Sequence, residues 1–235
     1  MFTRSARFYD AVYAWKDYAG EVAWIVANVR ERKPCARTLL DVACGTGKHL
    51  ELLRESFEVE GLDLDPELLK IARERLDEAV PLHEGDMRDF DLGRRFHAVT
   101  CLFSSIGYAR DERELRAAIA AMARHLEPGG ILLVEPWLTP EAYRVPHLGC
   151  RFVDEEELAI ARMNIAERGD GTSVLVFHYL VGTPEGIDRF TERHELGLFT
   201  VEQMLAAFRE AGLEVEHDPE GLMGRGLYVA TLQES

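Results

Sequence analysis

Over the first 137 residues, apolar runs of strand length alternate with stretches in which apolar residues recur at helical spacing. Strands are predicted at residues 37–43, 58–65, 79–83, 96–103 and 131–137. Helices are predicted at residues 18–31, 47–55, 66–77 and 111–126, and the third begins at Pro66, a residue that suits a first helical turn. Strands and helices that alternate in this way indicate an α/β fold with a parallel sheet and helices on both faces.

The pattern changes after residue 137. Residues 150–198 contain three strand-like runs with alternating apolar positions, and the sequence GDGT at 169–172 is typical of a tight hairpin turn. A helix at 200–211 and strands near 213–217 and 226–232 then return to the first pattern. We therefore predict a small antiparallel sheet inserted at residues 140–198, after the fifth strand. Such a block is too short to bury much core by itself, so residues 1–235 are expected to form one domain.

Composition excludes several classes of protein. The formal net charge is −15, and an acidic surface repels phosphate backbones, so we expect no nucleic-acid partner. The sequence has no apolar run of 18 residues, which predicts no membrane span. Its first residues, MFTRSARFYD, lack the apolar segment of a signal peptide.

The cysteines and histidines show no metal-ligand spacing. The four cysteines form no CxxC pair, so we interpret them as reduced thiols, buried or nearly so, in a cytoplasmic protein. We therefore predict no metal site.

The sequence DVACGTGKHL, which follows the first predicted strand, contains a glycine loop that fits two common nucleotide motifs poorly. A Walker loop needs glycine where Val42 stands and Ser or Thr where His49 stands. A dinucleotide fingerprint needs a third glycine, and Leu50 occupies that position. An NAD-dependent enzyme is therefore weakly supported.

A third arrangement fits the loop. One strand ends with Asp41, the sequence small-x-Gly-x-Gly leads into a helix, and Asp63 closes the next strand. Gly45 and Gly47 allow the backbone to approach a ligand and to adopt turns that a Cβ would hinder. Asp63 can accept hydrogen bonds from two ribose hydroxyls, as the acidic residue of nucleotide folds does.

This arrangement resembles the class I S-adenosylmethionine-dependent methyltransferases, which have a Rossmann-like sheet of seven strands. The sequence Gly85-Asp86-Met87 and the turn at residues 126–130 agree with the resemblance. It implies that Asp86 accepts from the adenine amino group, that Met87 packs on the ring and that Leu102 lines the site. The expected cofactor-binding residues are Tyr9, Tyr18, Asp41, Ala43, Gly45, Gly47, Asp63, Leu64, Asp86, Met87 and Leu102. For Tyr9 and Tyr18, ordinary aromatic packing is the alternative.

Longer phrases resemble a narrower group. The sequences LLDVACGTG, EGDMRDF, FSSIGY, VEPW and GRGLYV together are similar to the N,N-dimethyltransferases that act on nucleotide-linked amino sugars in macrolide biosynthesis. The similarity runs from about Tyr9 to Val229, and the inserted sheet would cover the acceptor side. It implies that Tyr108 faces the acceptor amine, that Glu135 is a candidate proton acceptor, and that the substrate-binding residues are Trp137, His178 and Arg225. The alternatives are a surface arginine at Arg225 and a half-buried, hydrogen-bonded histidine at His178.

The expected reaction is direct in-line displacement, with S-adenosylmethionine as methyl donor and S-adenosylhomocysteine as product. The acceptor is a small molecule, with the amine of a nucleotide-linked amino sugar as the first hypothesis. O- or N-methylation of another small metabolite is the second, and a cofactor-binding protein without turnover is a third. The apolar surface of the inserted sheet allows a homodimer, although nothing in the pattern requires one.

Overall fold

The computed structural model describes residues 4–234. The helices are η1 (Ala6–Phe8), α1 (Tyr9–Val12), α2 (Tyr18–Arg32), α3 (Lys48–Leu53), α4 (Pro66–Leu76), η2 (Ser105–Tyr108), α5 (Glu112–Arg124) and α6 (Val201–Glu210). The strands of the larger sheet are β1 (Thr38–Val42), β2 (Glu58–Asp63), β3 (Leu82–Glu84), β4 (Phe96–Cys101), β5 (Leu126–Val134), β10 (Leu213–Asp218) and β11 (Leu227–Leu232). The strands of the smaller sheet are β6 (His147–Glu155), β7 (Leu158–Arg168), β8 (Thr172–Thr183) and β9 (Gly186–Gly197).

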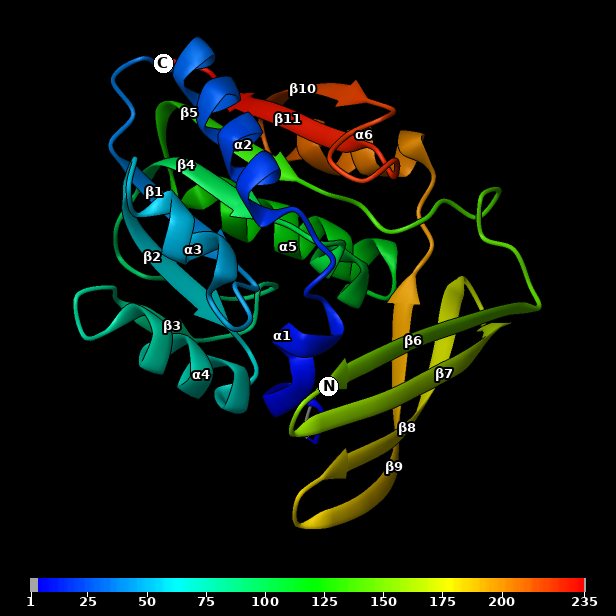
Figure 1. The fold of residues 1–235 in the computed structure, drawn as a ribbon. Coiled ribbons are helices and arrows are strands. Elements are labelled where there is room, and N and C mark those ends of the chain that lie inside the picture. Colours follow the sequence, from blue (N-terminus) through cyan, green and yellow to red (C-terminus); the bar gives the residue numbers. More distant parts are fainter. Residues whose placement is uncertain (1–3, 235) are drawn as a thin grey trace.

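The larger sheet has seven strands in the order β10-β11-β5-β4-β1-β2-β3, and β11 alone runs antiparallel to its neighbours, β10 and β5 (Figure 1). Alternate residues of its central strands point to opposite faces. Leu40 belongs to the core cluster that contains residues of α5 and α6, whereas Leu39 belongs to the cluster that contains residues of α2, α3 and α4. The predicted α/β sheet with helices on both faces is confirmed. The strand order reverses between β1 and β4, and crevices for ligands form at such a point, beside the carboxyl ends of the strands.

The smaller sheet is antiparallel, in the order β6-β7-β8-β9, and contains four strands where the sequence predicted three (Figure 1). The predicted number of strand-like runs within residues 150–198 is therefore wrong by one, because β6, β7, β8 and β9 all have residues in that range. The predicted hairpin turn is present between β7 and β8, with Gly171 at a φ of 66°. The block follows β5, so the predicted place of the insertion is confirmed.

Two strands of the larger sheet begin three or more residues away from their predicted first residues. The fifth strand begins at Leu126 rather than at residue 131, because it bulges at the Pro-Gly-Gly sequence and still pairs Leu126 with Phe96. Gly129, at a φ of 68°, makes this bulge possible. Strand β3 begins at Leu82, later than predicted.

The amino-terminal segment joins the two sheets. Phe8 and Val12 pack against the smaller sheet in a cluster that includes Tyr179 and Phe190. On its other side, Asp10 accepts a 2.7 Å hydrogen bond from the hydroxyl of Thr46 in the glycine loop. Figure 1 shows this segment between the two sheets, so residues that follow it can reach both the glycine loop and the inserted strands.

Two further expectations concern membranes and thiols. No helix among residues 4–234 is long and apolar enough to cross a membrane. All four cysteines are free, and Cys44 and Cys101 are buried as predicted. The prediction was wrong for Cys35 and Cys150, which are exposed because they lie in a loop and on the edge strand β6.

Candidate functional site

The glycine loop and Asp63 form one hydrogen-bonded unit. The Asp63 carboxylate accepts from the backbone N–H of Gly45 and from that of Asp65, both at 2.8 Å. Burial raises the pKa of Asp63, although these backbone hydrogen bonds oppose that shift. Asp63 thus holds the glycine loop in place. It also lines the adjoining cavity, where its carboxylate can contact a ligand.

The two loop glycines have different roles. Gly45 has a φ of 57°, and a Cβ there would meet no atom within 4 Å. That side of the loop is open to the cavity, as a bound ligand requires. At Gly47, a Cβ would lie 2.9 Å from the side chain of Leu76, so this glycine permits close packing of α3 against α4. Gly47 does not line any of the described cavities.

A cavity of about 390 Å³ lies beside this loop. The predicted cofactor residues that line it are Tyr9, Ala43, Gly45, Asp63, Leu64, Asp86 and Met87. Asp86 is engaged by the guanidinium of Arg88, whose Nε lies 2.9 Å from Oδ1, and this hydrogen bond lowers the pKa of Asp86. An adenine amino group would therefore share Asp86 with Arg88 or displace it.

A smaller space of about 30 Å³ continues from this cavity and is lined by three of the four remaining predicted cofactor residues, all except Gly47. Tyr18, Asp41 and Leu102 all line it. Asp41 is buried and accepts a 2.7 Å hydrogen bond from Thr100. Burial raises the pKa of Asp41 to about 6, against the opposing influence of His49 and of this hydrogen bond.

A buried polar cluster supports this end of the crevice, and sequence reasoning missed it. Lys16 forms an ion pair with Glu21, and the Nε2 atom of His49 lies 2.9 Å from the same carboxylate. Burial would raise the pKa of Glu21, but hydrogen bonds from His49 and Lys16 lower it. The Lys16 ammonium lies 4.8 Å from the ring centre of Tyr18. It therefore brings positive charge to the aromatic wall of the space.

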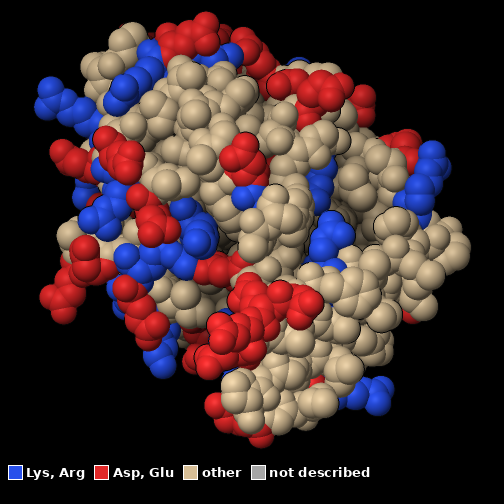
Figure 2. Space-filling model, in the orientation of Figure 1, with Lys and Arg blue, Asp and Glu red and all other residues tan. Residues whose placement is uncertain are grey.

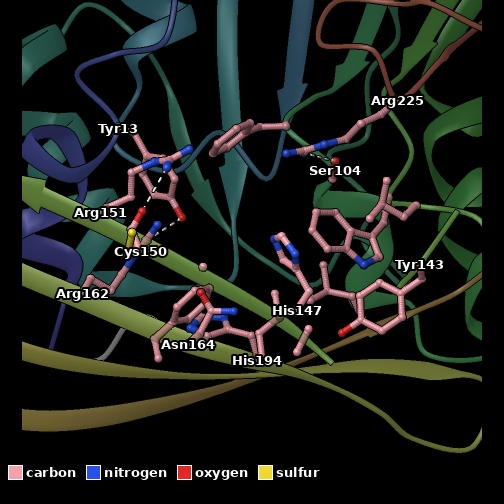
Figure 3. A pocket seen from close by; sticks show the side chains of 18 of the residues that line it. Tyr13, Ser104, Tyr143, His147, Cys150, Arg151, Arg162, Asn164, His194 and Arg225 are labelled. Carbon is pink, nitrogen blue, oxygen red and sulfur yellow. Dashed lines mark hydrogen bonds between the residues drawn. The ribbon is translucent and has the colours of Figure 1, made fainter. Parts of the chain in front are cut away.

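A second cavity, of about 640 Å³, separates the larger sheet from the inner face of the smaller one. Four arginines line it, namely Arg144, Arg151, Arg162 and Arg225, and none of its described lining residues is Asp or Glu. Figure 2 shows a hollow between the two parts of the molecule with basic side chains inside it. In Figure 3, Arg162 lies beside Tyr13 while Arg225 lies on the opposite side of the cavity.

These four arginines have no ion-pair partner within 4.0 Å among the described residues. Arg162 is 7% exposed and donates a 3.0 Å hydrogen bond to the Tyr13 hydroxyl. Arg151 is directly opposite Arg162 on the neighbouring strand. Like charges in that position destabilise a sheet, so a ligand that brings negative charge would relieve their repulsion.

Tyr108 stands where the two cavities meet and lines both. Its hydroxyl lies 2.7 Å from Nδ1 of His194, on β9. Burial raises the pKa of Tyr108, so the phenol stays neutral at physiological pH. A hydroxyl at this junction can hold an acceptor group next to whatever occupies the first cavity.

The other predicted acceptor residues are divided. Trp137 and Arg225 line the second cavity, with the guanidinium carbon 4.9 Å from the centre of the indole ring. Arg225 also donates a 2.8 Å hydrogen bond to Ser104. His178 is exposed and pairs with Met163 on the outer face of the smaller sheet, away from the cavity. Successive side chains of a strand point to opposite faces of the sheet, and Phe177 and Tyr179 lie on the inner face, so His178 points outward.

Glu135 lines none of the described cavities and is fully buried. Its Oε2 atom accepts a 2.7 Å hydrogen bond from the backbone N–H of Phe103, while Oε1 has no hydrogen-bond partner among residues 4–234. Phe103 and Ser104 both have positive φ angles, 53° and 62°, which non-glycine residues rarely adopt. Glu135 thereby supports a strained loop that faces the cavities.

The buried carboxyl gives a testable stability difference. Burial raises the pKa of Glu135 above its usual range. The native state therefore binds this proton more tightly than the unfolded state does. The resulting contribution to the free energy of unfolding is lost as the pH rises through the raised pKa. We expect Glu135→Gln to be more stable than the parent protein at neutral pH, with the difference shrinking on acidification. Urea unfolding across pH would measure it, and a difference that grows toward low pH would contradict the assignment.

Sequence reasoning also missed most of the acceptor cavity. Tyr13, Arg151, Arg162, Asn164 and Phe177 line it from segments far apart in the chain. No spacing signal marks them. The one available sign was polar and aromatic residues at alternate positions of the inserted strands, which indicates a sheet face that is neither core nor plain surface.

Comparisons with known proteins match both the glycine-loop part of the chain and the chain as a whole. A family model described as a methyltransferase domain matches residues 39–130, the glycine-loop part of the larger sheet. A dTDP-3-amino-3,6-dideoxy-α-D-glucopyranose N,N-dimethyltransferase from Streptomyces fradiae is 48% identical over 228 residues, covering 95% of this chain and 89% of the relative. A dTDP-3-amino-3,4,6-trideoxy-α-D-glucopyranose N,N-dimethyltransferase from Streptomyces venezuelae is 44% identical, covering 95% and 96%.

The similarity extends to solved structures. The S-adenosylmethionine-bound structure of an amino pentose methyltransferase of calicheamicin biosynthesis from Micromonospora echinaspora has a TM-score of 0.88 and 43% identity. The match covers 96% of this chain and 97% of that protein. The similarity therefore includes the inserted sheet as well as the glycine-loop half.

Proposed function

The chain belongs to the S-adenosylmethionine-dependent sugar N-methyltransferases, and from this premise we propose that it methylates the amine of a nucleotide-linked amino sugar. It is a methyltransferase, and its cofactor is S-adenosylmethionine. The observation that carries the choice of acceptor is the second cavity, whose charge is opposite to that of the whole molecule.

The charge contrast favours a phosphorylated acceptor. The chain carries a formal net charge of −15, yet four arginines without ion-pair partners among residues 4–234 line the cavity. An unpaired guanidinium as buried as that of Arg162 costs free energy unless an anion joins it. Guanidinium groups match the geometry of phosphate oxygens, so the diphosphate of a nucleotide sugar supplies the missing charge. A neutral small metabolite would leave these arginines unpaired.

The residues around the first cavity fit the cofactor. Asp63 lines the cavity, which supports its proposed role as acceptor for the ribose hydroxyls, and the open side of Gly45 leaves room for the ligand. Asp86 and Met87 stand where the adenine would lie, and Tyr18 and Asp41 border the narrow end assigned to the methionine part. When bound, S-adenosylmethionine supplies an activated methyl group on a sulfonium.

The protein contributes alignment. Tyr108 holds the amine at the junction of the two cavities, while Trp137 and the arginines fix the rest of the acceptor. Precise alignment of two reactants can contribute about 7–11 kcal/mol to lowering a barrier. Alignment and removal of the amine proton together account for the expected chemistry.

The experiment is an acceptor panel with product detection by mass. The panel contains dTDP-linked 3-amino and 4-amino sugars, the same sugars without nucleotide, and dTDP-sugars with a hydroxyl in place of the amine. We expect one or two methyl groups on the nucleotide-linked amines alone. Methylation of the free sugars at equal efficiency would reject the diphosphate argument, and methylation of the hydroxyl analogues would reject the amine.

A homodimer remains a prediction. Phe152, Met163, Ile165 and Leu180 are exposed on the outer face of the smaller sheet, and each is at least 49% exposed. In Figure 2, uncharged side chains dominate the surface over this sheet. A second copy could cover the face, and light scattering on the purified protein would measure the state. Free thiols in all four cysteines support the proposed cytoplasmic location.

A further inference from the structure

We propose that Tyr108, His194 and Glu192 form a proton relay that removes the proton of the acceptor amine. This inference rests on the proposed function, because it needs an amine at the junction of the two cavities. It assigns His194 as the group that receives the proton, with Tyr108 as the carrier and Glu192 as a positioning residue.

Geometry fixes the first part of the relay. Tyr108 ends the short helix η2, and its hydroxyl lies 2.7 Å from Nδ1 of His194. The imidazole is 2% exposed and packs edge-on against the ring of Phe177, with the ring centres 5.3 Å apart. His194 also lines both cavities. The imidazole is thus held within reach of the phenol, and the phenol within reach of the acceptor.

Glu192 fixes the other side of the imidazole. It lies two residues before His194 on β9, so strand alternation places both on the inner face. Its Oε2 atom is 3.8 Å from Nε2 of His194. Ser5 donates to the same carboxylate through its hydroxyl, and the backbone N–H groups of Arg4 and Ser5 donate to Oε1 at 2.9 and 3.0 Å.

These contacts keep Glu192 ionised. Burial would raise its pKa, but the neighbouring His194 imidazole and hydrogen bonds from Ser5 and the amino-terminal backbone lower it to about 2. A fixed carboxylate beside Nε2 favours the tautomer that carries its proton there. Nδ1 is then the acceptor for the Tyr108 hydroxyl, which leaves the lone pairs of the phenol oxygen for an amine N–H.

The proton balance is simple. A protonated amine transfers one proton to the oxygen of Tyr108 as the hydroxyl proton moves to Nδ1 of His194. The tyrosine ends neutral, the imidazole becomes imidazolium, and Glu192 balances its charge. The nitrogen keeps the electron pair of the broken N–H bond for methyl transfer. The imidazolium releases its proton to solvent through the acceptor cavity after product leaves.

The proton relay matters most if the enzyme methylates the same amine twice. Methylation of a neutral primary amine gives a protonated secondary amine, which cannot attack again until it loses a proton. Glu135 cannot take that role directly, because it lines neither cavity and has its Oε2 atom on the backbone of Phe103. His194 is the buried base that a hydrogen bond connects to the junction.

Several charged or titratable groups surround the relay. Tyr13, in the amino-terminal segment, and Asp63, in the larger sheet, both raise the pKa of Tyr108. From the smaller sheet, Glu192 and Tyr179 do the same, and Arg162 contacts the Phe177 ring that packs on the imidazole. Any measured pH profile therefore needs comparison with variants that leave these groups in place.

The test uses His194→Asn, Tyr108→Phe and Glu192→Gln, with His83→Asn on the edge strand β3 as a control. Turnover of the dTDP-amino sugar is measured at about pH 7 and at about pH 9. We expect His194→Asn and Tyr108→Phe to be slower at the lower pH by up to about 10²-fold, the low end of general-base contributions. The defect should shrink at least about tenfold at the higher pH, where more of the amine is already neutral, and monomethylated product should accumulate at the lower pH.

Outcomes separate the two proposals. If the parent protein methylates no nucleotide amino sugar, the proposed function fails. If it does, but the variants show an equal loss at both pH values or no loss at either, the relay fails alone. Glu192→Gln keeps the shape of the side chain and covers the case in which His194→Asn no longer binds S-adenosylhomocysteine.

A spectroscopic readout needs no acceptor. In the ¹⁵N spectrum of the protein with bound S-adenosylhomocysteine, we expect His194 to be protonated on Nε2 and unprotonated on Nδ1. Glu192→Gln should weaken this preference, whereas His83→Asn should not change it. Protonation on Nδ1 in the neutral imidazole would overturn the relay, because Tyr108 could then not donate its proton there.

Discussion

Replacing Asp63 with alanine is expected to weaken the binding of S-adenosylmethionine and S-adenosylhomocysteine by at least about 100-fold. The carboxylate accepts backbone hydrogen bonds from Gly45 and Asp65 and faces the first cavity. Hydrogen bonds to a charged group contribute about 1.5–3 kcal/mol each, and about 1.4 kcal/mol changes an affinity tenfold. Loss of the ribose contacts and of the loop anchor together accounts for the expected effect. Calorimetric titration would measure it.

The control is Asp111→Ala, which removes the carboxylate that caps α5 and accepts from the backbone of Glu114 at 2.8 Å. It should cost about 1 kcal/mol in unfolding free energy and leave cofactor affinity unchanged. NADH serves as a second ligand in the same titrations. Binding of NADH alone, or equal affinity of the parent and Asp63→Ala proteins for S-adenosylhomocysteine, would reject the assignment of the glycine loop.

Replacing both Arg162 and Arg225 with methionine is expected to raise the KM for the nucleotide sugar by about 10²–10⁴-fold, from two lost charge-assisted hydrogen bonds. The two side chains lie on opposite sides of the second cavity (Figure 3). Methionine keeps much of the packing against Phe177 and Trp137 while removing the charge. Affinity for S-adenosylhomocysteine should not change, because neither arginine lines the first cavity.

The effects of the single variants Arg162→Met and Arg225→Met on KM would show which arginine binds the diphosphate. We expect the larger effect from Arg162→Met, since Arg162 is the more buried and has Arg151 opposite it. Arg116→Met is the control, because Arg116 is on α5 and pairs with Glu112 and Glu210. Steady-state kinetics at two salt concentrations would measure the effect, which salt should reduce at the exposed arginines more than at Arg162. An unchanged KM in the double variant would exclude an anionic acceptor.

The fold could be predicted because its signals are local. Each buried strand of the larger sheet is a short apolar run, and the longer helices show their own periodicity and N-caps, as α4 does with Asp65 and Pro66. The predicted ends of strands were wrong where a local turn signal competes with strand pairing. The Pro-Gly-Gly sequence indicates a turn, but pairing with β4 keeps it within β5 as a bulge.

The cofactor crevice could also be anticipated in large part. Ten of the eleven expected cofactor residues line the first cavity or its narrow extension. Their roles there remain predictions. Gly47 is the exception, because close packing against Leu76 accounts for its lack of a side chain. The hydrogen bonds of Arg88 to Asp86 could not be foreseen, since no pattern specifies which way a surface arginine turns.

The acceptor site was much less predictable, because side-chain faces depend on register. A shift of one residue moves a strand's whole set of side chains to the other face of the sheet. Sequence reasoning therefore assigned His178 to the acceptor, whereas His178 faces outward and His194 faces the cavity. The same limit concealed Arg151 and Arg162, which become neighbours only through strand pairing.

By itself, the sequence determined the class of fold, the glycine loop with Asp63, and the type of reaction. Those features depend on spacing within short segments, where chain connectivity already fixes which residues are neighbours. Only the tertiary structure decided how Tyr108 meets His194, which partner Glu135 has, and where unpaired positive charge gathers. These contacts join residues far apart in the chain, and the packing of the two sheets across a shared cavity brings them within hydrogen-bond distance.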